Sequence, residues 1–169
     1  AVSPLRGTLV LIEALHLLKT QGYQVGLELI GPIQEDHRRE IGDLVRTYGL
    51  HGVNVRGYME AHQGWELMAG CTLGTALLAP IPNYMGSYPT KIFEYMCLGM
   101  PILASNFPLY KTIVEDLKCG YCIDPRSPEE VAKAIRRLID DPALASTLGE
   151  NGRAVVAQHF NWDNELRKL

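Results

Sequence analysis

The chain lacks the features that would assign it to a membrane or to a nucleic acid. Its 169 residues contain no apolar run of about 18 residues, the length that a membrane-spanning helix needs. It also lacks an excess of positive charge, because 19 acidic residues outnumber 16 lysines and arginines and leave a net charge of −3. A basic surface of the kind that binds nucleic acid is therefore not expected.

The phosphate-binding signatures of two large enzyme classes are also missing. No Gly-x-Gly-x-x-Gly follows a predicted strand, which argues against a dehydrogenase, and no Walker loop is present. Cysteine is scarce, and the chain has only Cys71, Cys97, Cys119 and Cys122. We interpret all four as reduced packing residues of a cytosolic protein, because the only Cys-x-x-Cys pair sits at the entry to a predicted strand and no second pair completes a zinc site.

What the chain does contain is an alternation of short apolar segments with longer helical ones. With 47% hydrophobic and 21% charged residues, it fits one globular domain. Strands are predicted at 24–31, 53–58, 73–79, 102–105 and 120–123. Helices are predicted from 4, 35, 59, 89, 107, 127, 141 and 160, and a long loop at 80–88. This alternation indicates an α/β fold with a doubly wound parallel sheet, which binds ligands beyond the carboxyl ends of its strands.

The most informative stretch is 87–105, which is predicted to form a loop, a short helix and a buried strand. Pro89 suits the first helical position, where its missing N–H costs nothing. At 3.6 residues per turn, Ile92 and Met96 would share an apolar face. The polar residues would gather on the opposite side of the helix: Ser87, Thr90, Lys91 and Glu94.

Lys91 is unusual, because a cation in the first helical turn meets the positive end of the helix dipole, a mismatch of about 0.3–1 kcal/mol. A bound anion would remove the mismatch, since free N–H groups, dipole and ammonium would converge on it. Glu94, one turn further on, can accept hydrogen bonds from hydroxyl groups. A nucleoside diphosphate would satisfy both residues, and a solvated Lys and Glu on an exposed face would explain the spacing equally well.

These residues resemble the C-terminal half of the family 4 (group 1) retaining glycosyltransferases of the GT-B fold. The most specific match is Pro89-x-Lys91-x-Phe93-Glu94-Tyr95-Met96-x-x-Gly99-x-Pro101-Ile102. Support comes from Pro125, from Ser127-Pro128-Glu129-Glu130 and from Gly149-Glu150-Asn151-Gly152-Arg153. The resemblance runs from Arg6 to Trp162 and implies that residues 1–169 form one Rossmann-like domain of a two-domain protein, whose N-terminal acceptor-binding domain is absent from this sequence.

The resemblance also implies roles for residues at the tip of the short helix. Glu94 matches a glutamate that binds the ribose hydroxyls, and the amides of Thr90 and Lys91 match the junction that cradles the diphosphate. Arg6 matches a basic residue that neutralises the same phosphates. The expected catalytic residues are thus Arg6 and Lys91, which would stabilise negative charge on the leaving diphosphate. The expected donor-binding residues are Gly86, Ser87, Thr90, Lys91 and Glu94.

Gly86 departs from the family pattern, because many members carry a glutamate eight residues before Glu94 that contacts the donor sugar. Sugar recognition would then fall to the backbone N–H groups of Gly86 and Ser87, or to Asn83 and Tyr84. A further arginine of the phosphate clamp would lie upstream of this sequence. The sequence therefore leaves the identity of the sugar open.

The implied reaction is transfer of a hexosyl group, with retention of configuration, from a UDP-, GDP- or ADP-sugar to a glycan or lipid-linked acceptor in polysaccharide biosynthesis. No metal or other cofactor is implied, and no Asp-x-Asp occurs in the chain. The implied partners are the sugar nucleotide and the N-terminal domain, without nucleic acid. The implied location is the cytoplasm, with peripheral contact at the inner membrane for the full-length protein. The domain is expected to be inactive alone.

Two other classes also fit the sequence. A sugar-nucleotide epimerase of similar architecture would need acid and base residues, for which only Glu60 and His62 are available. A non-catalytic module would keep the fold and bind the nucleotide without transferring sugar. Gly86, in place of the family's glutamate, is the best argument for this class. The base, the sugar, the acceptor and the oligomeric state stay open, although base contacts are expected from the loops after Gly31 and around 57–59.

Overall fold

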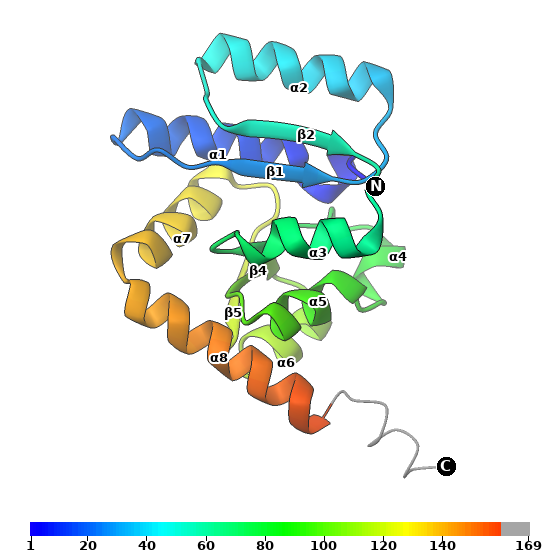
Figure 1. The fold of residues 1–169 in the computed structure, drawn as a ribbon, viewed down its shortest axis with the longest axis vertical. Helices are drawn as coiled ribbons and strands as arrows, with labels where there is room; N and C mark the ends of the chain where they lie inside the picture. Colours follow the sequence, from blue (N-terminus) through cyan, green and yellow to red (C-terminus); the bar gives the residue numbers. More distant parts are fainter. Residues whose placement is uncertain (160–169) are drawn as a thin grey trace.

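Parallel strands flanked by helices form residues 1–159, the part of the chain that this computed structural model describes (Figure 1). The strands are β1 (Leu27–Ile30), β2 (Val53–Gly57), β3 (Gly74–Ala76), β4 (Ile102–Ser105) and β5 (Gly120–Ile123). A 3₁₀ helix, η1 (Pro4–Arg6), precedes the α-helices. These are α1 (Thr8–Thr20), α2 (Glu35–Tyr48), α3 (Ala61–Ala69), α4 (Pro82–Met85), α5 (Thr90–Leu98), α6 (Pro108–Val114), α7 (Pro128–Asp140) and α8 (Pro142–His159).

The strands pair in parallel, which confirms the predicted α/β class, but the described strands form two hydrogen-bonded groups. β1 pairs with β2, and the second group has the order β3-β4-β5. The register between β1 and β2 shifts between Leu29 and Ile30. The chain runs outward from β1 to β2 in one group and outward from β3 to β5 in the other, as in a doubly wound fold.

Predicted and observed elements differ mainly at their ends. β4 and β5 have the predicted bounds, whereas β1 is shorter than the predicted 24–31. The stretch 80–88 is not wholly a loop, because it contains the short helix α4. Pro89 occupies the N-cap of α5 rather than its first helical position, so this helix begins one residue later than predicted. The helix predicted to begin at Phe160 lies outside the described residues.

Side chains cap the first turns of α7 and α8. The Ser127 hydroxyl accepts a hydrogen bond of 3.2 Å from the Glu130 N–H, and the Asp141 carboxylate accepts one of 2.9 Å from the Leu144 N–H. The Glu130 carboxylate accepts from the Asp124 N–H at 3.0 Å, whereas the Ser127 N–H donates to the Asp124 carbonyl, so the reciprocal bond of a capping box is not formed.

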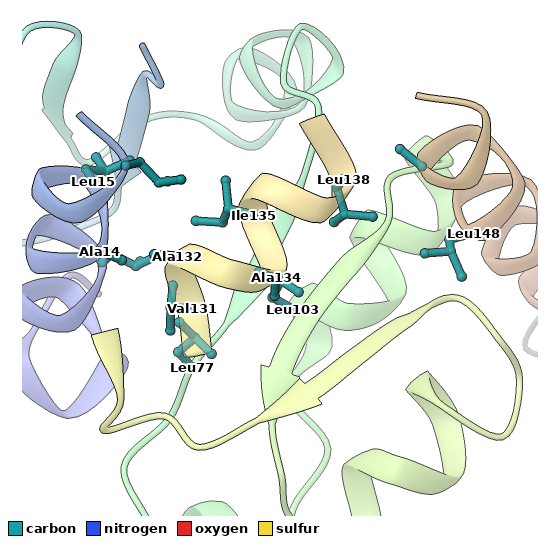
Figure 2. Close-up of a cluster of buried hydrophobic side chains, with 13 residues drawn as sticks. Ala14, Leu15, Leu77, Leu103, Val131, Ala132, Ala134, Ile135, Leu138 and Leu148 are labelled. Atoms are coloured by element: carbon teal, nitrogen blue, oxygen red, sulfur yellow. The ribbon is translucent and has the colours of Figure 1, made fainter. Parts of the chain in front are cut away.

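β4 runs through the core and contributes side chains to both faces of the sheet. All four of its residues are buried. Leu103 points to the face that α1 and α7 cover, where it joins the cluster drawn in Figure 2. Ile102 and Ala104 point to the opposite face, which α5 and α6 cover. This alternation is expected for a strand in a sheet that has helices on both sides.

Helices α1 and α7 pack against each other through small and branched side chains. In Figure 2, Ala14 and Leu15 of α1 face Ala132 and Ile135 of α7. A separate cluster joins α1 to β1 and α2 through Val2, Ile12, Leu29 and Ile41. None of the helices within residues 1–159 combines the length and the apolar character that a membrane span requires.

The C-terminal end of α5 is fixed against α8 at close range. The Arg153 guanidinium donates to the Leu98 carbonyl at 3.0 Å. A Cβ on Gly149 would lie only 1.9 Å from the carbonyl oxygen of Gly99, so α8 can approach this closely only because residue 149 is glycine. The motif at 149–153 therefore serves packing, and it holds one end of α5 rigidly in place.

Candidate functional site

A cavity of about 1050 Å³ extends along β1 and β3, and residues at the starts of α1 and α5 line one part of it. This part lies beyond the carboxyl end of β3, at the edge where parallel α/β sheets bind ligands. It contains five of the residues predicted from sequence, Arg6, Ser87, Thr90, Lys91 and Glu94, and we call it the rim site. Thr8 and Tyr84 line the same cavity and complete the rim site. The fold thus brings together two stretches that lie about eighty residues apart in sequence.

Two helix N-termini open into the rim site without a side-chain cap. α1 begins after Gly7, which has a φ of +73°, and α5 begins after Pro89. Neither helix has an acidic residue in its first turn. Free backbone N–H groups and two helix dipoles therefore present partial positive charge to the cavity, which favours binding of an anion.

Lys91 adds a full positive charge that its surroundings disfavour. Burial, and next the charge of Arg6, lower the pKa of Lys91 to about 8, while Glu94 acts in the opposite direction. Keeping the ammonium charged in the empty site therefore has a free-energy cost. An anion bound between Lys91 and Arg6 would remove that cost.

Arg6 reaches the rim site from η1 and lies over an aromatic ring. Its guanidinium carbon is 5.6 Å from the centroid of the Tyr84 ring, within the range of a cation–π contact. The Tyr84 backbone is anchored in turn, because its carbonyl accepts a hydrogen bond of 2.9 Å from the hydroxyl of the buried Tyr110. The sequence suggested Tyr84 only as a sugar contact, and no local pattern signals its position beneath Arg6.

Glu94 lies one turn after Lys91 and lines the same cavity. It is half-buried, and its charge is close enough to favour the ammonium form of Lys91. On the other side of α5, Ile92 and Met96 are fully buried. The predicted division of this helix into a polar face toward the cavity and an apolar face toward the core is therefore confirmed.

The loop before α5 presents a hydroxyl group to the cavity. Ser87 lines the cavity, and its hydroxyl donates to the Asn83 carbonyl at 2.8 Å. The Gly86 N–H donates to the Pro82 carbonyl at 3.1 Å, and Gly86 is not among the residues that line the cavity. Gly86 would have to give up this bond to contact a sugar through its N–H, so its role in sugar recognition stays a prediction.

Groups for acid–base or metal chemistry are sparse around the rim site. Glu60 lines the cavity at the start of α3, whereas His62 is exposed and lies outside the lining. Across residues 1–159, no three or more His, Cys, Asp or Glu side chains are grouped so that they could hold a metal ion. The four cysteines, all within this range, are free thiols. Independence from metals and cofactors stays a prediction.

Comparison with known proteins identifies the family. The family model described as "Glycosyl transferases group 1" matches residues 2–155, which include every residue of the rim site. The chain therefore belongs to the group 1 glycosyltransferases, and it has the fold of the C-terminal domain of their GT-B architecture. The resemblance inferred from residues 89–102 is confirmed.

Individual relatives are distant and longer than this chain. A D-inositol 3-phosphate glycosyltransferase from Nocardioides sp. is 25% identical over 178 residues, which cover 99% of this chain and 38% of the relative. Alr3699/HepE from Anabaena, crystallised with UDP and glucose, has a TM-score of 0.82 at 27% identity. The match covers 98% of this chain and 44% of the HepE chain. The C-terminal domain of LpcC from Francisella tularensis has a TM-score of 0.79 at 18% identity. The match covers 95% of this chain and 83% of the LpcC chain, and it shows only that the two share a fold. The chain thus spans less than half of each of the first two relatives.

Proposed function

We propose that the chain is the nucleotide-diphospho-sugar-binding domain of a retaining glycosyltransferase, which transfers a hexosyl group from a UDP-, GDP- or ADP-sugar to a glycan or lipid-linked acceptor. One observation carries this proposal: Arg6, Lys91 and the uncapped start of α5 converge on one cavity. Family membership narrows the anion that this arrangement would bind to the diphosphate of a sugar nucleotide. The UDP and glucose bound to the Anabaena relative support the same ligand class.

In the proposed complex, the diphosphate lies against the N–H groups of Thr90 and Lys91. The Lys91 ammonium and the Arg6 guanidinium neutralise its charge, and charge-assisted hydrogen bonds of this kind are the strong ones in proteins. The Glu94 carboxylate accepts hydrogen bonds from the two ribose hydroxyls. The spacing of one helical turn between Lys91 and Glu94 matches a ligand whose phosphate and vicinal hydroxyls are neighbours.

The proposed reaction breaks the bond between the anomeric carbon of the sugar and the terminal phosphate oxygen, and the electron pair stays on that oxygen. The acceptor hydroxyl forms the new bond to the anomeric carbon, and its proton passes to the phosphate oxygen that departs from the same carbon. Arg6 and Lys91, which line the same cavity, would act by stabilising the charge that grows on the departing diphosphate. This role requires no metal ion.

The remaining parts of the proposal concern the whole protein. The acceptor would bind to an N-terminal domain, and the C-terminal domain alone would bind donor without transferring sugar. The location we propose is the cytoplasm, with peripheral contact at the inner membrane. These statements rest on the family resemblance alone.

A thermal-shift panel with UDP, GDP, ADP and their hexose conjugates, each in EDTA, tests the proposal. One nucleotide series should raise the melting temperature, because a ligand at about 100 times its Kd adds about 2.7 kcal/mol to the free energy of unfolding. A Lys91→Met variant should lose the shift. The matched Lys133→Met variant, altered at an exposed position of α7, should keep it. No shift with any nucleotide, or equal shifts in both variants, would contradict the proposal.

Gly86 favours a second candidate, a non-catalytic module that binds the same nucleotide. Release of free nucleotide from its sugar conjugate by the intact protein would exclude this candidate. The epimerase is less well supported, because His62 lies outside the cavity and leaves Glu60 without the second acid–base group that the sequence offered.

A further inference from the structure

A buried histidine on a helix outside the rim site is bonded to a residue that lines it. His37 lies in the first turn of α2, and the starts of α1 and α2 lie at the same end of the fold (Figure 1). The Nε2 atom of His37 is 3.1 Å from the hydroxyl oxygen of Thr8, which lines the rim site. His37 itself is only 7% exposed. Its ring therefore acts on the site through Thr8 rather than by contact with a ligand.

Thr8 extends this contact to η1, the short helix that carries Arg6. The Thr8 hydroxyl donates to the Ser3 carbonyl at 2.5 Å, and the Arg6 N–H donates to the same carbonyl at 2.9 Å. Ser3 is the N-cap of η1, so both bonds fix the start of this helix. The chain of hydrogen bonds from His37 thus ends at the backbone from which the Arg6 side chain extends.

The direction of each bond follows from its two partners, which assign the proton positions. A hydroxyl has one proton and a carbonyl can only accept, so the proton of Thr8 lies toward Ser3. The Thr8 oxygen is left to accept, and His37 Nε2 must carry the proton between them. On the other side of the ring, Nδ1 is 2.9 Å from the Glu40 carboxylate, which only accepts when it is ionised. Both ring nitrogens are therefore donors, which is the imidazolium form.

Glu40 stabilises this charged form of the ring. It forms an ion pair with His37 from three residues further along α2, and its side chain is 49% exposed. A carboxylate that stays in contact with water keeps its charge, and a negative charge in contact with the ring favours the cation. The pair is neutral as a whole. The ring therefore contributes the direction of its N–H to the rim site rather than a net charge.

We propose that His37 is a positioning residue for Arg6. Glu40 holds the ring as an imidazolium, and the ring keeps the Thr8 hydroxyl directed at the Ser3 carbonyl. That carbonyl fixes the backbone of Arg6, so that the guanidinium is held where it meets the anion. The part that concerns the anion rests on the proposed function, whereas the chain of hydrogen bonds does not.

The state of the ring gives the first test, which needs no ligand. NMR on the ¹⁵N-labelled intact protein at pH 7 should show a proton on both ring nitrogens of His37. Glu40→Gln keeps the shape of the partner, but its amide can donate as well as accept. In this variant Nδ1 should lose its proton while Nε2 keeps its own. A ring nitrogen without a proton in the unaltered protein would overturn the proposal.

Hydrogen exchange tests the link from the ring to η1. His37→Leu removes both bonds of the ring and places an apolar side chain one turn before the buried Ile41. The Arg6 amide should then exchange about 10-fold faster, relative to Leu103 in β4, than in the unaltered protein. His51→Leu, altered at an exposed position before β2, is the matched control and should not change this ratio. An unchanged ratio in His37→Leu would overturn the proposal.

Calorimetry with inorganic pyrophosphate tests the effect on the rim site. His37→Leu and Arg6→Met should each weaken binding by about 10-fold, the size expected for a lost hydrogen bond to a charged group. The double variant should bind as Arg6→Met does, because the ring acts through Arg6. Losses that multiply in the double variant would show a role apart from Arg6 and overturn the proposal.

The three measurements separate this proposal from the proposed function. An unaltered protein that does not bind pyrophosphate would contradict the proposed function. The protons of the His37 ring and the exchange of the Arg6 amide would then decide the present proposal, since neither measurement requires a ligand. The ring protons are measured in the unaltered protein, so this result decides even if His37→Leu does not fold.

Discussion

Helices α5 and α7 begin in opposite ways, although a proline stands beside the first turn of each. In α7 the Ser127 hydroxyl accepts from the Glu130 N–H, and acidic side chains follow in the first turn. In α5 the N-cap is Pro89, no side chain caps the helix, and the first turn carries Lys91. α7 therefore satisfies its positive end from within the protein, whereas the positive end of α5 carries an added cation and has neither a side-chain cap nor an acidic residue in its first turn.

The two ends of α5 show the same contrast on a smaller scale. Its C-terminal end is fixed by the Arg153 bond to Leu98 and by the contact of Gly149 with Gly99. Its N-terminal end makes no side-chain capping bond. Rigid packing at one end lets the other hold its donors in place without a side-chain cap, which is the arrangement that a preorganised binding site needs.

Reversing the charge of Lys91 should give the largest effect. Lys91→Glu makes the first turn of α5 resemble that of α7, and it should weaken binding of the cognate nucleoside diphosphate by about 100-fold, since it removes one charge-assisted hydrogen bond and adds repulsion. Titration calorimetry measures the loss. The matched Lys133→Glu variant in α7 should bind within twofold of the unaltered protein. An affinity for Lys91→Glu within threefold of the unaltered protein would contradict the assignment.

Removing the Glu94 carboxylate should give the next largest effect. Glu94→Ala should weaken binding of the nucleoside diphosphate by about 1.5–3 kcal/mol, the range for a hydrogen bond to a charged group. Binding of inorganic pyrophosphate, which has no ribose, should not change. Calorimetry with both ligands separates the two contributions, and Glu66→Ala on α3 serves as a control. Equal losses for both ligands would show that Glu94 does not bind the ribose.

The affinity should also fall as the pH rises. The pKa of Lys91 in the empty site is about 8, and a bound anion raises it, so binding takes up a proton above pH 8. Between pH 7 and pH 9 the affinity should drop by roughly 5- to 10-fold. Lys91→Met should abolish this dependence, as measured by calorimetry in buffers of different ionisation enthalpy. The free energy of unfolding of the empty protein should move the opposite way and rise from pH 8 toward 10.5, because the unfolded state then binds more protons.

We expect the smallest effect from a change at the start of α7, which has a structural role alone. Ser127→Ala removes the cap of α7 and should lower the free energy of unfolding by about 1 kcal/mol, as measured by urea denaturation. The affinity for the nucleoside diphosphate should stay unchanged. A loss of affinity in this variant would mean that the two helix starts are coupled and would weaken the contrast between them.

The sequence predicted those parts of the fold that local patterns determine. β4 and β5 were predicted to the residue because they are short apolar runs, and the start of α7 was predicted because Ser127 and Pro128 form a local capping signal. α4 was missed because its four residues lie in a Pro- and Gly-rich stretch without helical periodicity. Pro89 was placed one position too far into α5, a difference that depends on backbone angles rather than on residue type.

The rim site was predicted only in part from sequence. Lys91 and Glu94 could be found from their spacing on one helix, and Arg6 from its match to the family. The contact between Arg6 and the Tyr84 ring depends on packing that joins distant segments, including the bond from Tyr110 to the Tyr84 carbonyl. The division of the strands into two hydrogen-bonded groups likewise depends on which strands pair, and no single segment of sequence encodes it.

We expect the start of α5 to bind a diphosphate, and titration of the ¹⁵N-labelled protein, followed by NMR, would show this at the residues concerned. The ligand is the nucleoside diphosphate that gives the largest thermal shift. The amides of Thr90 and Lys91 should shift the most, inorganic pyrophosphate should reproduce these shifts and the parent nucleoside should not. Amide shifts confined to other parts of the protein, with Thr90 and Lys91 unmoved, would contradict this expectation.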